Sequence, residues 1–449
     1  MNPIAPVFFV FLAVMAWAFQ VRTQWITRFG IFSALLIAMF VRYGIAVPFS
    51  DGVNPAVTHI AITSFQLAEY YASVVLVYVF MFAGVLAVDH VWPRGRQAGS
   101  GNVAAKGTLV AVAGLITAVV VLAWVIIPWR DFIDGIFSLI PGHTMSSYRA
   151  HRVQYGDATL YSSSIFTYIG SFVRFALAPA ALWILYFHRK RSNLLAAMFW
   201  FLLAVLLAIG VLSGQKLPAI LLLIGFGIAV VIEAGRPSIV NWRFAAVAVA
   251  FVLVLTPALY LIQYPGSGYG AVLNLTFFRL AEEYSRVAQL RFVFYPDIHP
   301  FLHGLSSFVL RGAASLVGIS TGDAQSPETY IPTHSPGAGA SYGGTWNAGF
   351  FADAWADFGF LGVSGASLLI GIVVRLIDRW YSSSGQGPLE MGAYTALCIS
   401  AIYVSEVATL TAIWTFGLGS VFIVYAALRL PDWLKRNSRV KPAQERAPV

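Results

Sequence analysis

Charged residues are scarce in this chain. Asp, Glu, Lys and Arg make up only 10% of its 449 residues, whereas a soluble globular protein carries about 25%. Hydrophobic residues make up 59%, and they gather in runs of roughly 20 residues, the length of a helix that crosses a hydrocarbon core of about 30 Å. The composition excludes an ordinary soluble fold and predicts an all-α protein that crosses a membrane many times.

Cysteine and the common cofactor motifs are also rare or missing. Cys398, the single cysteine, lies in an apolar run, which excludes a disulfide framework and a thiolate metal site. The sequence has no glycine-rich nucleotide loop, serine nucleophile elbow or acidic metal-binding triplet. We therefore expect no cofactor, no metal centre and no soluble nucleotide substrate. The net charge of +9 is explained by Lys and Arg retained on the cytoplasmic side rather than by nucleic-acid binding.

Hydropathy predicts about eleven transmembrane helices in a single integral membrane domain of residues 1–449. Met1–Gln20 lacks a basic region before its apolar run and a small-residue cleavage site after it, so we interpret it as a span rather than a signal peptide. The predicted spans are residues 3–20, 29–48, 66–88, 108–128, 166–187, 194–212, 216–233, 244–262, 348–374, 391–407 and 410–428.

The basic residues predict the orientation of these spans. Most of the Lys and Arg residues fall in loops on one side, which is cytoplasmic by the positive-inside rule. The N-terminus then faces outward and the C-terminus inward. The loops on the basic side contain Arg22 and Arg28, the linker from Arg94 to Lys106, the HRKR run at 188–191, Arg236 and Arg243, Arg375 and Arg379, and the tail from Arg429 to Arg446.

Two long segments, residues 129–165 and 263–347, lie on the predicted outer side. Loops of this length without linker composition are usually functional. Within the second segment, residues 274–294 predict an amphipathic helix that ends before Pro296. Its polar face carries Arg279, Glu282, Glu283 and Arg286. The outer side is therefore the expected place of function.

Two arginines, Arg42 and Arg174, lie in the outer halves of predicted spans. Because Arg at mid-bilayer costs roughly 2.5–3.5 kcal/mol on insertion scales, such a residue normally faces a cavity or a partner. The alternative is that each side chain snorkels to the outer headgroups. Lys216 has a similar ambiguity: Gly214 and Pro218 would let a ligand approach closely, but a Lys at a helix end is also an ordinary interfacial anchor.

Further arginines on the outer side suggest an anionic ligand. Guanidinium groups bind phosphate oxygens bidentately and stay charged at any working pH, so a converging set suits a diphosphate on a lipid tail. The alternative for Arg279 and Arg286 is pairing with the glutamates of their own helix. The set comprises Arg149, Arg152, Arg279, Arg286, Arg291 and Arg311.

The histidines offer a general base more readily than a metal site. His299 and His303 are four residues apart, but Pro300 lies between them and no HExxH context is present. A histidine titrates near neutral pH and can accept a proton from an acceptor hydroxyl. His303 and His334 are the candidates, and the sequence does not rank them.

The stretch GGTWNAGFFADAWADFGFLGVSGASLLIGIVVR, Gly343–Arg375, places acidic and aromatic residues at the start of an apolar span. Asp353 and Asp357 are four residues apart and share one helix face. They either serve a ligand site or cap the helix and its dipole. The stretch resembles the C-terminal signature of bacterial oligosaccharide repeat-unit polymerases, the O-antigen polymerase (Wzy-type) family. The matching residues are Asn347, Gly349, Asp353, Asp357, Phe358, Gly359, Leu361, Gly362, Gly371 and Arg375.

This resemblance implies a GT-C-like, metal-independent glycosyltransferase of the bacterial inner membrane, with a periplasmic N-terminus and a cytoplasmic C-terminus. Such enzymes join repeat units carried on undecaprenyl diphosphate at the periplasmic face, and a polysaccharide chain-length regulator is a candidate partner. By analogy with the related O-antigen ligases, Arg279, Arg286 and Arg291 would bind the diphosphate, and a histidine would act as base. Fixed cations would stabilise the leaving diphosphate without a metal.

The resemblance also implies a glycan-binding surface. Aromatic rings near the signature are candidates for stacking on sugars, although Trp and Tyr also form interfacial belts. Tyr342, Trp346, Asn347, Asp353 and Asp357 are the candidate contacts, together with Phe350, Phe351, Trp355 and Tyr330. The alternative functions are an O-antigen ligase, which transfers to lipid A core, and a transporter or flippase for a lipid-linked or anionic substrate, which would more often show internal repeats.

We predict that Arg279→Ala or Arg286→Ala abolishes glycan chain growth, because the leaving diphosphate then loses its cations. The variants should still insert into the membrane. Polymer length on gels and protein level in membrane fractions are the measurements, and wild-type polymer lengths in both variants would contradict the diphosphate assignment.

Overall fold

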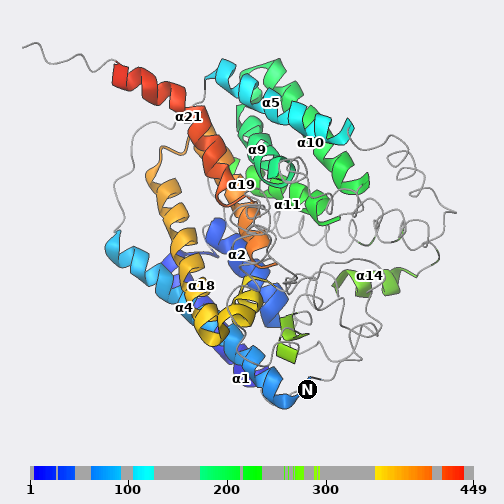
Figure 1. The fold of residues 1–449 in the computed structure, drawn as a ribbon, viewed down its shortest axis with the longest axis vertical. Helices are drawn as coiled ribbons and strands as arrows, with labels where there is room; N and C mark the ends of the chain where they lie inside the picture. The colour runs from blue at the N-terminus through cyan, green and yellow to red at the C-terminus, as the bar shows by residue number, and fades with distance from the viewer. Residues whose placement is uncertain are drawn as a thin grey trace, which may run out of the picture.

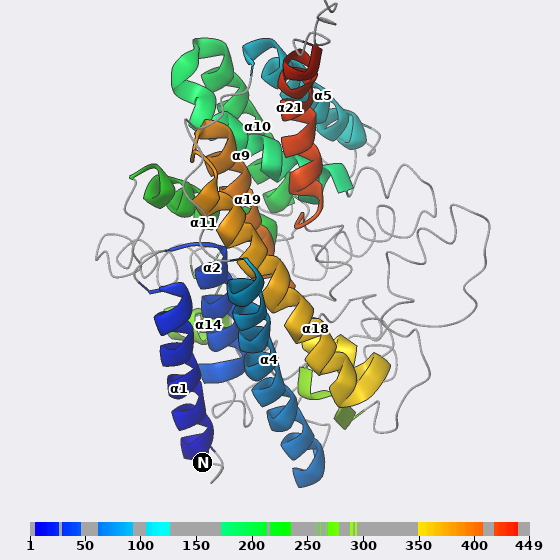
Figure 2. The same cartoon turned by 90° about the vertical axis from the view of Figure 1, so that its left-hand side faces the viewer.

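The computed structural model describes residues 5–26, 29–45, 62–92, 105–125, 172–212, 216–234, 257, 261, 266, 268–277, 288–290, 292–293, 349–406 and 417–438. Every regular element in these ranges is a helix, and no strand occurs among them. The helices pack against one another in a single bundle (Figures 1 and 2). The expectation of an all-α protein is therefore confirmed for the described part of the chain.

The described helices follow the hydropathy pattern closely. Each predicted span except 244–262, of which only residues 257 and 261 are described, overlaps a helix, although the helix that overlaps 410–428 begins at Ser420 and continues to Ser438. The elements are α1 (Ala5–Thr23), α2 (Ile31–Met39), the π-helix η1 (Phe40–Ile45), α4 (Ser64–Val91), α5 (Lys106–Val125), the π-helix η3 (Val173–Leu177), α9 (Ala178–His188), the 3-10 helix η4 (Arg189–Arg191), α10 (Asn193–Leu212), α11 (Lys216–Glu233), α14 (Tyr269–Phe277), α18 (Phe350–Ser383), α19 (Pro388–Val404) and α21 (Ser420–Ser438).

Two of the described helices, α4 and α18, are long and apolar enough to cross a membrane, with mean hydropathies of 2.3 and 2.1 in their most apolar windows. Shorter apolar stretches occupy α1, α2, α5, α10, α11, α19 and α21. The predicted amphipathic helix 274–294 lies mostly outside the described residues, and α14, at its start, begins earlier than expected, at Tyr269.

Helix α18 is not the uninterrupted span that hydropathy predicts for residues 348–374. Its backbone breaks at Phe358 (φ −139°, ψ 15°) and Gly359 (φ 58°, ψ −145°), and the conformation of Gly359 is one that residues with a Cβ rarely adopt. The break separates a short arm, residues 350–357, from a long arm, residues 360–383. A Cβ on Gly362 would overlap the carbonyl of Ala354, so the two arms approach each other closely at the bend.

The long arm packs against α4 along most of its length, and Figure 2 shows the two helices side by side. Glycines allow this contact: a Cβ on Gly84 would lie 2.5 Å from the carbonyl oxygen of Leu368, and one on Gly371 would overlap the backbone of Met81. At the end of the same interface, Asp89 accepts hydrogen bonds from Arg375 Nε at 2.8 Å and Arg379 Nη2 at 2.5 Å. Backbone contact and partly buried ion pairs therefore fix α4 on α18.

Helix α19 packs against helices from early and late parts of the chain, namely α2, α9, α11, α18 and α21. It packs on α9, where a Cβ on Gly392 would lie 2.5 Å from Ile184 Cα. Near its start, the Tyr394 hydroxyl accepts a hydrogen bond from Ile31 N–H at 3.0 Å and donates one to Asp378. These bonds tie the beginning of α2 and the end of α18 to α19.

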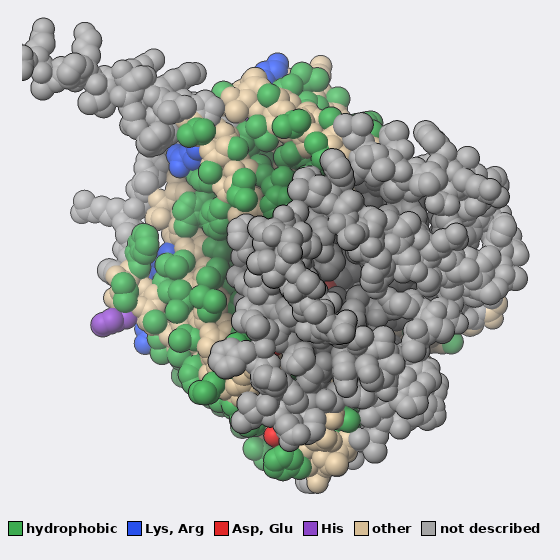
Figure 3. All heavy atoms as spheres, in the orientation of Figure 1, with side chains coloured by type: hydrophobic (Ala, Val, Ile, Leu, Met, Phe, Trp, Pro, Cys, Tyr) green, Lys and Arg blue, Asp and Glu red, His purple; other side chains and the backbone are tan. Residues whose placement is uncertain are grey.

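The outer surface of the bundle is strongly apolar. On α1, Phe8, Leu12, Met15 and Phe19 face the core. The opposite face of the same helix exposes Val7, Val10, Val14, Trp17 and Val21, each more than half exposed. In Figure 3, hydrophobic side chains likewise cover much of the described surface, and charged ones are few. A helix that is apolar all round needs an apolar environment on its outer face as well.

We predict that Gly371→Ala destabilises the protein by about 1–3 kcal/mol, because the new methyl group forces α4 and α18 apart. Gly365→Ala on the same helix is the matched control, because a Cβ there meets nothing within 4 Å and alanine favours the helix. Thermal unfolding in detergent is the measurement, and equal midpoints for the two variants would contradict the close contact.

Candidate functional site

The predicted intramembrane arginine Arg42 forms a buried ion pair with Glu406. Arg42 is 6% exposed and Glu406 only 1%, and Arg42 Nη2 donates to Glu406 Oε1. Its Nη1 donates to the Ser405 hydroxyl and, at 3.2 Å, to the carbonyl of Ile402. Of the two alternatives for Arg42, the structure shows pairing inside the bundle and not snorkelling to headgroups.

Three segments meet at this ion pair. The Tyr43 hydroxyl donates to the carbonyl of Ser405 at 2.6 Å, and Gly349 N–H donates to the carbonyl of Glu406 at 2.9 Å. Gly349 has φ +80°, and a Cβ there would overlap the Tyr43 hydroxyl. We call these five residues, Arg42, Tyr43, Gly349, Ser405 and Glu406, the polar node. It joins η1, the end of α19 and the start of α18.

The short arm begins directly at the polar node and carries the two predicted carboxylates. Asp353 and Asp357 are 3% and 7% exposed and lie one helical turn apart. Asp353 is in the first turn, where the positive end of the helix dipole stabilises a carboxylate. Asp357 ends the short arm, so the dipole of that arm does not stabilise it. The helix-dipole explanation therefore accounts for Asp353 and leaves Asp357 to other interactions.

Part of the second long outer segment packs on the short arm. The Phe292 ring lies 4.2 Å from the Trp355 ring, and Tyr70 contacts both Phe292 and Phe351. Phe350 and Phe351 are fully buried, and Phe351 meets Tyr43 edge-on with ring centroids 4.8 Å apart. The rings of the short arm therefore pack on each other and on Tyr43, Tyr70 and Phe292.

The polar node and a second polar cluster lie at opposite ends of α2. One end of this segment meets Tyr394 and Asp378, and Arg42, eleven residues after Ile31, lies about 16 Å away along the helix. At the first end, Arg375 also donates to the carbonyl of Arg22 at 3.3 Å. The contacts thus bring together Arg22, Arg375 and Arg379, which the sequence analysis assigns to one side, and separate them from Arg42.

A third polar group lies at the end of α11. Glu233 accepts hydrogen bonds from Arg189 at 2.9 Å, Lys190 at 2.7 Å and the Tyr186 hydroxyl at 2.9 Å, and the Arg189 guanidinium lies 3.6 Å above the Tyr186 ring. This group fastens the basic turn η4 to α11. Because Glu233 is 30% exposed and Lys190 75%, its ion pairs are well solvated, unlike the pair in the polar node.

The side chains of the other predicted site residues are not among those that the structure describes. Arg174 lies in η3 and Lys216 begins α11, and the structure describes only the backbone of these two. The remaining ones lie outside the described residues: Arg149, Arg152, Arg279, Arg286, Arg291, His303, Arg311, His334, Tyr342, Trp346 and Asn347. Their roles remain predictions.

Sequence reasoning missed two members of the polar node, Tyr43 and Ser405. Each directly neighbours a charged residue in an apolar run, in VRYG and VSEV. A polar residue next to a buried charge is a usable signal, because the charge needs additional hydrogen-bonding groups around it. Among the described residues, no group of three or more His, Cys, Asp or Glu is arranged to hold a metal ion.

Comparisons of the chain with protein-family models, curated proteins and solved structures found no match.

We predict that Arg42→Ala lowers the free energy of unfolding by about 3–5 kcal/mol, because it leaves the carboxylate of Glu406 buried without its cation. The double variant Arg42→Met/Glu406→Leu should recover most of this loss, since no buried charge then remains. Glu233→Gln is the control for a solvated pair and should cost about 1 kcal/mol or less. A loss at Arg42 no larger than that at Glu233 would contradict a desolvated ion pair.

Proposed function

We propose that the chain is a polytopic protein of the bacterial inner membrane, with a periplasmic N-terminus and a cytoplasmic C-terminus. The apolar outer face of α1 supports membrane embedding, since a lipid environment would cover Val7, Val10 and Trp17. The hydropathy of α4 and α18 supports it as well. The end of the bundle that holds Arg22, Arg375 and Arg379 would then be cytoplasmic and the polar node periplasmic.

The proposed activity is polymerisation of oligosaccharide repeat units carried on undecaprenyl diphosphate, as in the O-antigen polymerase family that the Asn347–Arg375 stretch resembles. One observation carries this proposal. The part of the signature with Asp353 and Asp357 is a separate short arm that begins at the polar node and packs on Phe292 of the second outer segment. A helix that only crosses a membrane would need neither a break nor two buried carboxylates near its start.

The reaction needs an acceptor, a base and a site for the leaving group. A sugar hydroxyl of the acceptor unit attacks the anomeric carbon of the donor, the bond from that carbon to the diphosphate oxygen breaks, and the hydroxyl proton passes to a base. His303 and His334 are the candidates for the base. Arg279, Arg286 and Arg291 are the candidates to bind the diphosphate, which leaves with its lipid, and fixed cations stabilise it best in a poorly solvated site.

Within this scheme the described residues take supporting roles. The polar groups of Arg42 contact Ile402, Ser405 and Glu406, so Arg42 is a positioning residue that holds the end of α19 against η1. The start of the short arm joins the same end of α19 through Gly349 N–H. Asp353 and Asp357 either orient arginines of the outer segment or accept hydrogen bonds from glycan hydroxyls. Both roles suit carboxylates that are buried beside a ligand site.

The test is to incubate purified protein with lipid-linked repeat units alone. Ladders of longer glycans on the lipid support the polymerase. Transfer that occurs only when lipid A core is added indicates a ligase. Movement of intact lipid-linked units across vesicles without chemical change indicates a transporter or flippase, and either of these two results overturns the proposal.

We predict that Asp357→Asn lowers the rate of polymerisation at least tenfold without a matching loss of stability, because it removes a charge from the site while keeping its shape. Glu69→Gln is the matched control, a carboxylate near the start of α4 that is partly exposed and should leave the rate unchanged. Equal rates for the two variants would assign Asp357 a purely structural role.

A further inference from the structure

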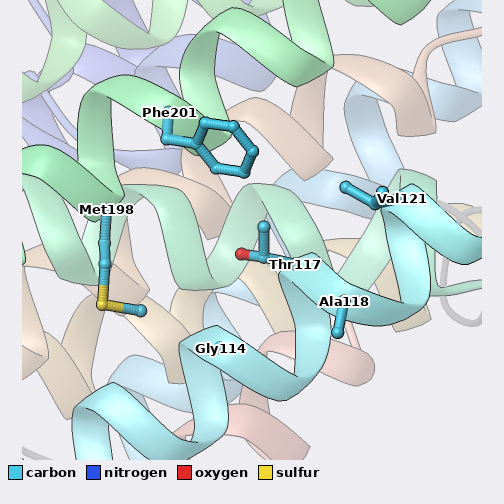
Figure 4. A pocket seen from close by; sticks show the side chains of 6 residues that line it. All are labelled: Gly114, Thr117, Ala118, Val121, Met198 and Phe201. Carbon is cyan, nitrogen blue, oxygen red and sulfur yellow. The ribbon is translucent and has the colours of Figure 1, made fainter.

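An apolar groove lies between α5 and α10, away from the polar node. It has a volume of about 420 Å³ and is lined by Gly114, Thr117, Ala118 and Val121 of α5 and by Met198 and Phe201 of α10 (Figure 4). The Thr117 hydroxyl donates to the carbonyl of Ala113 at 2.7 Å, so the one polar side chain of the lining is satisfied within its own helix. The groove therefore suits a hydrocarbon chain.

Small residues form the floor of this groove. Gly114 has no side chain, and a Cβ there would meet only Met198 Cε, at 4.0 Å. Phe201, which forms part of the opposite wall, is 56% exposed, so the groove opens at the surface of the bundle. Because helix backbones that carry small residues can pack closely, α5 and α10 could approach each other here without leaving a groove.

Cations lie at one end of the two helices that line the groove. Met198 lies over Gly114 and Phe201 over Thr117, so α5 and α10 run in the same direction (Figure 4). Lys106 begins α5, and Arg191 directly precedes α10 through Ser192, so both cations lie at the same end. Both are exposed. Lys106 is about 12 Å before Gly114 along α5, and Asn193, two residues after Arg191, is about 8 Å before Met198 along α10.

We infer that this groove is a binding site for an anionic phospholipid, with one acyl chain along Gly114–Val121 and the headgroup phosphate at Lys106 and Arg191. The separation between these cations and the groove fits a lipid, because the glycerol and ester groups of a phospholipid separate its headgroup phosphate from its hydrocarbon chains. None of the six lining side chains is charged, and Glu233 at the neighbouring turn holds Arg189 and Lys190. The inference rests on the membrane placement under the proposed function, and not on the glycosyl transfer.

The test uses the full-length purified protein in detergent and phosphatidylglycerol with a photoreactive group in its acyl chain. Cross-links mapped by peptide mass spectrometry are expected in residues 114–121 and 198–201. Unlabelled phosphatidylglycerol should compete at least fivefold better than phosphatidylcholine, since each cation near an anionic headgroup contributes about a fivefold preference. Equal competition by the two lipids, or labelling elsewhere on the surface only, overturns the inference.

Variants separate the acyl site from the headgroup site. Gly114→Leu fills the groove and should reduce labelling there at least fivefold, whereas Gly365→Leu, at an open position on α18, should leave it unchanged. Lys106→Gln/Arg191→Gln should abolish the preference for phosphatidylglycerol while labelling of the groove persists. If Gly114→Leu does not fold, Ala118→Leu replaces it.

The remaining outcomes are equally decisive. Lipid-independent cross-linking of two protein copies through α5 would identify the groove as a dimer interface and overturn the inference. Labelling that meets all expectations in a protein without polymerase activity would support the lipid site and reject only the glycosyl transfer.

Discussion

The buried pair of Arg42 and Glu406 is the interaction on which the arrangement of the proposed periplasmic end depends. Charges this deeply buried are tolerated only with a partner and with hydrogen bonds to their remaining polar groups. Ile402 and Ser405 accept hydrogen bonds from Arg42, and Gly349 N–H donates to the carbonyl of Glu406. The Tyr43 hydroxyl donates to the neighbouring carbonyl of Ser405. The pair therefore determines where η1, the end of α19 and the start of α18 can lie relative to one another.

The break in α18 has its physical cause in the same region. The short arm is held at the polar node by Gly349, and the long arm is held on α4 by Gly84, Gly371 and the ion pairs of Asp89. A straight helix cannot meet both constraints, and Gly359 supplies the backbone conformation that reconciles them. The bend puts Asp353 and Asp357 on an arm that is separate from the long arm.

The two ends of the bundle differ in chemistry. At the polar node, three buried carboxylates, Asp353, Asp357 and Glu406, lie on segments that meet within a few residues of Gly349. At the opposite end, Asp89 of α4 pairs with Arg375 and Arg379 of α18, and Asp378 lies 4.0 Å from Arg375. Two carboxylates and two guanidinium groups therefore lie together where α4 meets α18. The opposite end thus holds ion pairs between α4 and α18, whereas the polar node holds the buried pair of Arg42 and Glu406. The apolar groove between α5 and α10 lies outside both groups.

The sequence by itself determined the helical class of the described residues and the approximate places of most of their helices, because a helix satisfies the backbone hydrogen bonds of a long apolar run within the run itself. It also identified Arg42, Asp353 and Asp357 as unusual, since isolated charges in apolar runs require an explanation. Only the tertiary structure decided that Arg42 pairs with Glu406, 364 residues away, because hydropathy carries no information about which spans are neighbours. It also decided that α18 breaks at Gly359, since a glycine in a span is compatible with a straight helix until packing at both of its ends forces the bend.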